Sequence, residues 1–162
     1  MDFQSSVVVD KAQFTFSSEE EARFSAGLSN ATRGWTRVVI KLLYVEDNDD
    51  SIYMLKMQLE LLGDIEVLTA EDGEKGCEMA TAERPDIILM DLEMPVVDGW
   101  EATRRLKGNP QTRDIPIIAL SAHALAGEHE KAMAAGCDEF DTKPIDFDRL
   151  VATVRRILAD RK

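Results

Sequence analysis

Five polar side chains stand at or shortly after the ends of four apolar stretches of the chain. In chain order they are Glu46, Asp47, Asp91, Ser121 and Lys143. An acidic residue after a strand has an ordinary explanation, because Asp and Asn often cap the next helix, as Asp47, Asn48 or Asp49 could here. With a bound Mg²⁺, a carboxylate nucleophile, a lysine and a hydroxyl are the parts needed for phosphoryl transfer to an aspartate.

Three converging carboxylates also call for a cation. Like charges at close range raise one another's pKa unless a positive ion neutralises them. Mg²⁺ is a hard ion that accepts a site with few protein ligands and several waters. Such an ion and Lys143 would neutralise charge on a transferring group, and Ser121 would hydrogen-bond one of its oxygens. The set therefore predicts a magnesium-dependent phosphoryl-transfer site.

The chain alternates five times between a strand pattern and a helix pattern. The predicted strands are 38–45, 65–69, 87–90, 115–120 and 138–141. The predicted helices are 50–62, 73–83, 99–107, 127–135 and 147–159. Continuous apolar strands joined by helices are typical of an α/β fold with a doubly wound parallel sheet that is covered on both faces. Ligands bind outside the carboxyl ends of such strands, so we expect the five polar side chains at one edge.

Composition and charge narrow the function classes. The chain has 162 residues, 44% of them hydrophobic, which suits one globular domain with an appendage. A net charge of −12 disfavours nucleic acid and anionic membrane surfaces as partners. The sequence contains neither a membrane-spanning apolar run nor a signal peptide, and Cys77 and Cys137 form neither a metal spacing nor a disulfide framework. We therefore expect a cytoplasmic protein.

Residues 1–37 differ from the rest and are predicted to be a partly helical extension. Ser17 or Ser18, each followed three residues later by Glu, could begin a helix through Asn30. The segment contains four of the six phenylalanines. It could be the remnant of an upstream domain or a docking arm, and the sequence leaves both open.

Residues 38–162 resemble the receiver domain of two-component response regulators. The motifs that carry the resemblance are Leu43–Asn48, Ile88–Pro95, Asp98–Gly99, Ile117–Ala122 and Lys143–Pro144. They stand in the family's order and spacing over about three-quarters of the chain. The resemblance implies a flavodoxin-like five-stranded sheet with strand order 2-1-3-4-5.

The resemblance also implies a role for each matching residue. Asp91 corresponds to the phosphoacceptor, and Lys143 to the active-site lysine, with a cis peptide before Pro144. The implied Mg²⁺ ligands are Glu46, Asp47, Asp91 and the backbone carbonyl of Glu93. The implied switch residues are Ser121 and Phe140. Glu93 and His123 occupy two variable positions that influence phosphoryl lifetime. Core packing for Phe140 and a surface loop for His123 stay open as alternatives.

The implied function is a signalling domain rather than a classical enzyme, although it can catalyse its own phosphorylation and dephosphorylation. A histidine kinase or a histidine phosphotransfer protein would donate the phosphoryl group. The face made by 127–135, 138–141 and 147–159 would then bind a downstream protein or a second copy. We expect a stand-alone receiver, with a receiver from a hybrid histidine kinase or an unphosphorylated scaffold as alternatives.

Two enzyme or cofactor-binding classes fit less well. A phosphatase of the haloacid dehalogenase type carries an Asp and then a Thr or Val where this chain has Glu93 and Pro95. A flavodoxin-like cofactor binder needs a glycine-rich or hydroxyl-rich loop after the first strand, and the sequence Glu46–Asn48 is not one.

Overall fold

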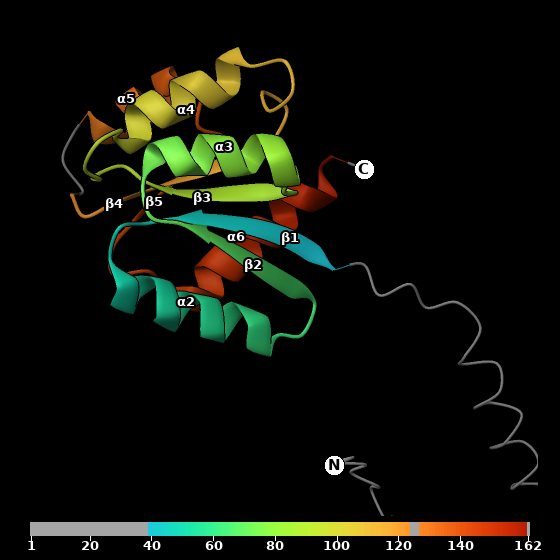
Figure 1. Cartoon of the computed structure of the whole chain (residues 1–162). Helices are drawn as coiled ribbons and strands as arrows, with labels where there is room; N and C mark the ends of the chain where they lie inside the picture. The colour runs from blue at the N-terminus through green and yellow to red at the C-terminus, as the bar shows by residue number, and fades with distance from the viewer. Residues whose placement is uncertain (1–38, 124–126, 162) are drawn as a thin grey trace, which may run out of the picture. The chain divides into compact units, whose positions relative to one another are not determined.

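A five-stranded parallel sheet with helices on both faces forms the part of the chain that the computed structural model describes, residues 39–123 and 127–161 (Figure 1). The strands are β1 (Ile40–Val45), β2 (Ile65–Ala70), β3 (Ile87–Asp91), β4 (Ile117–Ser121) and β5 (Glu139–Thr142). The helices are α2 (Asp49–Leu61), α3 (Gly73–Glu83), α4 (Gly99–Gly108), α5 (Glu128–Ala135) and α6 (Phe147–Ala159).

The strand order is β2-β1-β3-β4-β5, and every neighbouring pair is parallel. This confirms the predicted doubly wound sheet and its order. The order reverses between β1 and β3, where the connecting chains leave in opposite directions and open a crevice at the carboxyl ends of the strands. Val45 lies opposite Met90 in the register, so the residues that follow β1 lie beside the end of β3.

Two apolar clusters, one on each face, hold the helices to the sheet. Leu43 and Val45 point into the cluster beneath α3, α4 and α5, and Leu42 and Tyr44 point into the cluster beneath α2 and α6 (Figure 1). Successive residues of a strand face opposite sides, so a strand buried on both faces must be apolar throughout. The same alternation places Tyr44 and Glu46 on one side of β1.

Short polar side chains begin four of the helices. The capping residues, each of which accepts a hydrogen bond from the backbone N–H three positions ahead, are Asn48, Asp72, Asp98 and Asp146. The cap of α2 is therefore Asn48, with Ser51 N as its donor at 2.8 Å. The structure thus removes capping as the explanation for Asp47.

The observed elements differ from the predicted ones mainly at their ends. Val39 is 46% exposed and precedes β1, which begins at Ile40. The fourth strand begins at Ile117 rather than Ile115, because Ile115 N closes a turn on Thr112 O at 2.9 Å and Pro116 has no N–H to donate. The expectations for 1–37 lie outside the described residues.

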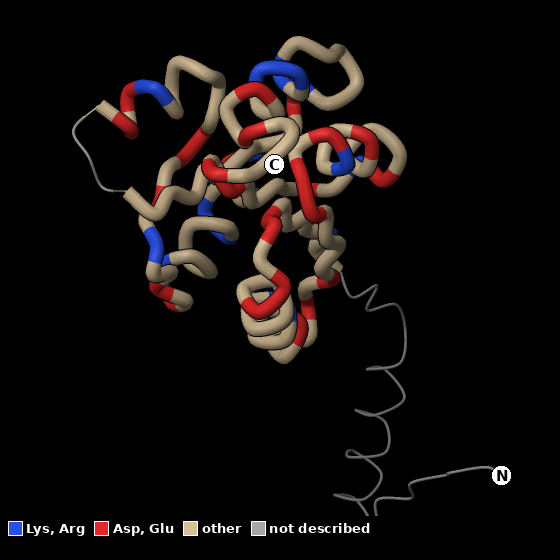
Figure 2. The backbone as a smooth tube through the Cα atoms, turned by 60° about the vertical axis from the view of Figure 1, so that its left-hand side comes forward, with Lys and Arg blue, Asp and Glu red and all other residues tan. Residues whose placement is uncertain are grey.

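The acidic residues and the two cysteines can be located in the described part of the chain. Asp and Glu are spread along helices and loops alike over the described backbone (Figure 2). Cys77 and Cys137 are both free thiols. Among the helices that the structure describes, none combines the length and the apolar character that crossing a bilayer requires.

Candidate functional site

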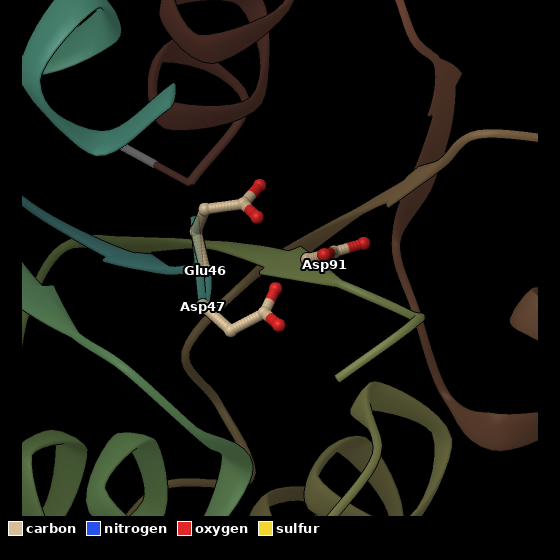
Figure 3. A group of neighbouring side chains, drawn as sticks. All are labelled: Glu46, Asp47 and Asp91. Atoms are coloured by element: carbon tan, nitrogen blue, oxygen red, sulfur yellow. The ribbon is translucent and has the colours of Figure 1, made fainter. Parts of the chain in front are cut away.

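Three carboxylates meet at the crevice between β1 and β3. Glu46 and Asp47 follow β1, Asp91 ends β3, and their side chains point toward one another (Figure 3). One oxygen from each lies within 4.8 Å of the others. Asp47 is exposed, whereas Glu46 and Asp91 are only 1% and 3% exposed. The predicted acidic cluster is therefore assembled, with one member open to solvent.

The carboxylate of Glu46 is held by three donors. Lys143 Nζ and Tyr44 Oη donate to Oε2 at 2.6 Å and 2.9 Å, and Asn48 N donates to Oε1 at 3.2 Å. Burial alone would raise the pKa of Glu46, but these donors, Lys143 foremost, hold it below the usual value. Glu46 is thus a buried carboxylate that stays ionised.

The carboxylate of Asp91 is less well compensated. Glu93 N donates to Oδ1 at 3.2 Å, and Lys143 Nζ lies 3.3 Å from Oδ2. Burial raises the pKa of Asp91 to about 6, and the charge of Glu46 adds to the rise against the opposing effects of Glu93 N–H and Lys143. Of the two buried carboxylates, Asp91 is therefore the one whose ionised form is disfavoured and which a bound cation would stabilise.

Lys143 bridges the two buried carboxylates. Its backbone N–H donates to Ser121 O at 2.8 Å, which joins the segment after β5 to the end of β4. The Lys143–Pro144 peptide is cis, as the family resemblance implied. Burial lowers the pKa of the Lys143 ammonium, but the hydrogen bond to Glu46 and the charge of Asp91 raise it overall. The side chain therefore keeps its positive charge between them.

Gly99 lets α4 begin directly against the phosphoacceptor candidate. A Cβ at this position would lie 2.1 Å from the carbonyl oxygen of Asp91, closer than any real side chain. Its N–H also donates to Leu92 O at 3.3 Å. The Asp98–Gly99 pair thus supplies a helix cap and then a residue small enough for the close approach.

Ser121 and the neighbouring loop residues lie at the same edge. Ser121 is fully buried, and its hydroxyl bonds with the backbone of His123. The exposed side chains of His123 and Glu93 pair through Nδ1 and Oε1, which links the loop after β4 to the loop after β3. Both variable positions therefore stand beside the acidic cluster and contact each other.

Phe140 lies apart from this group. It is half-buried in β5 and packs against the cluster beneath α3, α4 and α5. Its ring meets the ring of His129 on α5 edge to face, with centroids 5.7 Å apart. The contact between the two rings joins β5 to α5.

Tyr44 is the site residue that the sequence analysis missed. Its side chain is 1% exposed, and its hydroxyl makes the 2.9 Å hydrogen bond to Glu46. Burial, and then the charge of Glu46, raise its pKa, so the hydroxyl stays protonated and remains a donor. The available signal was the spacing, because residues two apart on a strand share a side.

The donor set suits a hard divalent cation. Three carboxylates offer oxygen atoms only, and the exposed Asp47 has no capping role that would occupy it. Burial and the charge of Glu46 disfavour the ionised form of Asp91. A cation among these oxygens would offset the negative charge of both buried carboxylates and would be attracted by both. The residues present therefore fit Mg²⁺, as the sequence predicted.

Comparison with known proteins agrees with this arrangement. The response regulator receiver domain family matches residues 42–155. The polar-differentiation response regulator DivK of Brucella anthropi is 34% identical over 119 residues, which cover 74% of this chain and 96% of DivK.

Two solved structures extend the likeness to three dimensions. The receiver domain of sensor histidine kinase PA1611 from Pseudomonas aeruginosa, solved with a magnesium ion coordinated in its active site cleft, is 35% identical. It covers 75% of this chain and 98% of its own, with a TM-score of 0.69. Chemotaxis protein CheY4 from Vibrio cholerae is 28% identical over 74% of this chain and 98% of its own, also with a TM-score of 0.69.

The family match runs from within β1 to within α6. The matches with DivK and the PA1611 receiver domain cover those proteins almost from end to end. The likeness therefore includes the whole sheet and the crevice that carries the carboxylates. The chain belongs to the family of response regulator receiver domains.

Proposed function

We propose that this chain accepts a phosphoryl group from a phosphohistidine onto Asp91 in a Mg²⁺-dependent reaction and then changes its binding face. The observation that carries the proposal is the position of Asp91. Its carboxylate is buried, lies 3.3 Å from Lys143 Nζ and belongs to a cluster of three acidic groups. Membership of the receiver family supports the same conclusion.

Four groups would hold the metal ion. They are the carboxylates of Glu46, Asp47 and Asp91 and the backbone carbonyl of Glu93. Bound there, Mg²⁺ supplies positive charge that offsets the negative charge of the carboxylates and of an incoming phosphoryl group. The magnesium ion in the active site cleft of the PA1611 receiver domain supports a magnesium site in this chain.

The transfer exchanges one bond for another. An oxygen of Asp91 attacks phosphorus, and an O–P bond forms while the N–P bond of the phosphohistidine breaks. The imidazole leaves with the electron pair of that bond and is neutral, because its other nitrogen carries a proton. Lys143 stays protonated and stabilises negative charge on the transferring oxygens. The donor is a histidine kinase or a histidine phosphotransfer protein.

The switch follows from the added charge. A phosphoryl group on a side chain carries about −1.5 to −2 charges near neutral pH, which draws the Lys143 ammonium and the Ser121 hydroxyl toward it. Movement of Ser121 breaks its bonds with His123, at the start of the segment that leads to α5. The face made by α5, β5 and α6, including the His129–Phe140 contact, then changes and binds a downstream protein or a second copy.

The remaining assignments extend the proposal. Residues 38–162 are the receiver, and residues 1–37 lie outside it. The protein acts in the cytoplasm as a stand-alone receiver, a proposal that the match with 96% of DivK supports. The second candidate is a receiver of a hybrid histidine kinase. This candidate is supported by the 35% identity with the receiver domain of the sensor histidine kinase PA1611, which is close to the 34% identity with DivK.

Intact mass measurement after incubation with acetyl phosphate and Mg²⁺ tests the proposal. We expect one phosphoryl adduct on the native chain, and no adduct with EDTA or in Asp91→Asn. Asp86→Asn is the matched control, because its carboxylate binds Lys41 N at 2.8 Å, outside the acidic cluster, and its adduct should persist.

A second arm uses a phosphohistidine-bearing phosphotransfer protein as donor. An adduct with this donor alone keeps the proposal and excludes small-molecule donors. If the folded native chain gains no adduct from either donor, the proposal is wrong and a scaffold role takes its place.

A further inference from the structure

Two donors share a single oxygen of Glu46. Lys143 Nζ lies 2.6 Å from Oε2 and Tyr44 Oη lies 2.9 Å from the same atom, while Asn48 N serves Oε1. Glu46 is 1% exposed, so water has little access to replace a donor that leaves. Each of the two donors on Oε2 therefore matters most when the other is absent.

Lys143 is the donor that has a second task. Its Nζ already lies 3.3 Å from Asp91 Oδ2, between the two buried carboxylates. A phosphoryl group on Asp91 would add charge and acceptor oxygens on that side, so the ammonium would move away from Glu46. A buried carboxylate that loses a charged donor without replacement is strongly destabilised.

Tyr44 is placed to prevent that loss. Its ring packs in the cluster beneath α2 and α6 and is only 1% exposed, so the core holds the hydroxyl in place. Tyr44 and Glu46 stand two residues apart on and just after β1, a segment anchored by β2 and β3 on either side. The hydroxyl therefore stays in place when Lys143 moves.

We propose that Tyr44 is a positioning residue whose hydroxyl keeps the Glu46 carboxylate hydrogen-bonded and oriented when Lys143 turns toward the phosphoryl group. The inference rests on the proposed function. In the phosphorylated state the hydroxyl would hold Glu46 by a hydrogen bond, whereas the ring only fills the core. The hydroxyl and the ring can be separated experimentally, because Phe retains the ring.

The test compares Tyr44→Phe with Tyr53→Phe. Tyr53 is the only other tyrosine and is 66% exposed on α2, which makes it a matched control. Calorimetry measures binding of Mg²⁺ alone, and then of beryllofluoride, a phosphoryl mimic, at saturating Mg²⁺. We expect Tyr44→Phe to bind Mg²⁺ within about twofold of the native chain but beryllofluoride about tenfold more weakly. Tyr53→Phe should match the native chain in both.

A spectroscopic readout separates positioning from packing. In Tyr53→Phe the only tyrosine left is Tyr44, so the Cζ resonance of ¹³C-labelled tyrosine reports its hydroxyl. We expect that resonance to shift on addition of beryllofluoride, as the hydroxyl becomes the only donor on Oε2. Thermal unfolding verifies that the variants remain folded.

The outcomes are distinct. Native-like beryllofluoride affinity in Tyr44→Phe, or a tyrosine resonance that does not respond, overturns the inference for Tyr44 and leaves the proposed function standing. An equal loss of Mg²⁺ and beryllofluoride affinity also overturns it, because the hydroxyl then acts in both states. If the folded native chain binds no beryllofluoride and gains no phosphoryl adduct, the proposed function and the inference fail together.

Discussion

The hydroxyl of Ser121 forms two hydrogen bonds with the backbone of His123. It accepts from His123 N at 3.0 Å and donates to His123 O at 3.1 Å. A serine hydroxyl has one proton, so it cannot donate to a phosphoryl group while it donates to this carbonyl. A response in which Ser121 donates to the phosphoryl group must therefore break the hydrogen bond to His123 O.

Removal of this hydroxyl should separate phosphorylation from switching. We expect Ser121→Ala to gain the phosphoryl adduct, because Asp91 and Lys143 are unchanged, yet to lose the response of α5 and β5. Hydrogen exchange over 127–142, measured with and without beryllofluoride, provides the comparison. Ser121→Thr retains a hydroxyl and should respond like the native chain. A full exchange response in Ser121→Ala would show that the hydroxyl does not transmit the change.

The Glu93–His123 pair should lengthen the life of the phosphoryl group. The pair joins two loops beside Asp91 and engages the carboxylate of Glu93. We expect it to hinder the approach of water to the phosphoryl group. The side chains are 44% and 58% exposed, and pairs of this kind contribute about 0.2–1 kcal/mol. We therefore expect Glu93→Gln and His123→Ala each to speed dephosphorylation by up to about fivefold.

A double variant tests whether the two residues act as a pair. Glu93→Gln combined with His123→Ala should dephosphorylate no faster than either single variant, because the contact is already lost in each. Rates followed by intact mass after removal of the donor decide this. Single effects that multiply in the double variant would mean that the residues act separately.

The sequence predicted the strands and the carboxylate cluster because both follow from simple rules. Runs such as Ile87–Met90 are apolar throughout, and parallel strands end at one edge, so Asp91 had to lie near Glu46. The ends were less predictable. Ile115 is apolar and buried like a strand residue, yet a turn with Thr112 holds it outside β4.

Side-chain directions could not be predicted in the same way. Tyr44 reads as one more apolar strand residue, and only the structure shows that its hydroxyl reaches Glu46. The orientation of the Ser121 hydroxyl depends on the loop that follows it rather than on its neighbours in the strand. Both features depend on rotamers and loop geometry, which residue types alone do not determine.

The exposed apolar face of α2 should contribute to docking of the phosphohistidine donor. The large exposed apolar side chains there are Tyr53, Met54, Met57 and Leu61, with Leu62 at the C-cap. Met54 lines the same cavity as Lys143 and Pro144, so this face adjoins the site that a donor must reach. We expect Met54→Glu to slow transfer from a phosphotransfer protein about tenfold, with no change in the acetyl phosphate rate.

Met133→Glu is the control for this experiment. Met133 is 42% exposed, close to the 51% of Met54, but belongs to α5 on the other face of the sheet (Figure 1). Its rates with both donors should stay near those of the native chain. If Met54→Glu slows both donors equally, the change has disturbed the site itself and the face of α2 is not a docking surface.

Replacement of Asp91 by Asn should stabilise the metal-free protein at neutral pH. The pKa of Asp91 is raised to about 6 in the folded state by burial and by Glu46, whereas an unfolded Asp titrates near its ordinary value of about 3.9. Above pH 6 the folded state therefore holds a charge that it disfavours. The difference corresponds to a gain of about 2–3 kcal/mol in the free energy of unfolding for Asp91→Asn.

The pH dependence has a definite sign. As the pH falls through 6 toward 4, Asp91 takes up its proton in the folded state first, and most of this penalty on the native chain disappears. The advantage of Asp91→Asn, measured by urea unfolding in EDTA, should be full at pH 7.5 and fall to about 0.5 kcal/mol at pH 4. The exposed carboxylate of Asp47 provides the control, and Asp47→Asn should change stability by less than about 0.5 kcal/mol.

Added Mg²⁺ should reduce the stability advantage of Asp91→Asn over the native chain. A cation that binds the folded state stabilises it in proportion to its affinity, and the native chain offers one carboxylate more than Asp91→Asn. We therefore expect added Mg²⁺ to raise the unfolding midpoint of the native chain more than that of the variant. If Asp91→Asn is less stable than the native chain in EDTA at pH 7.5, Lys143 compensates the buried charge of Asp91 more fully than the raised pKa of Asp91 indicates.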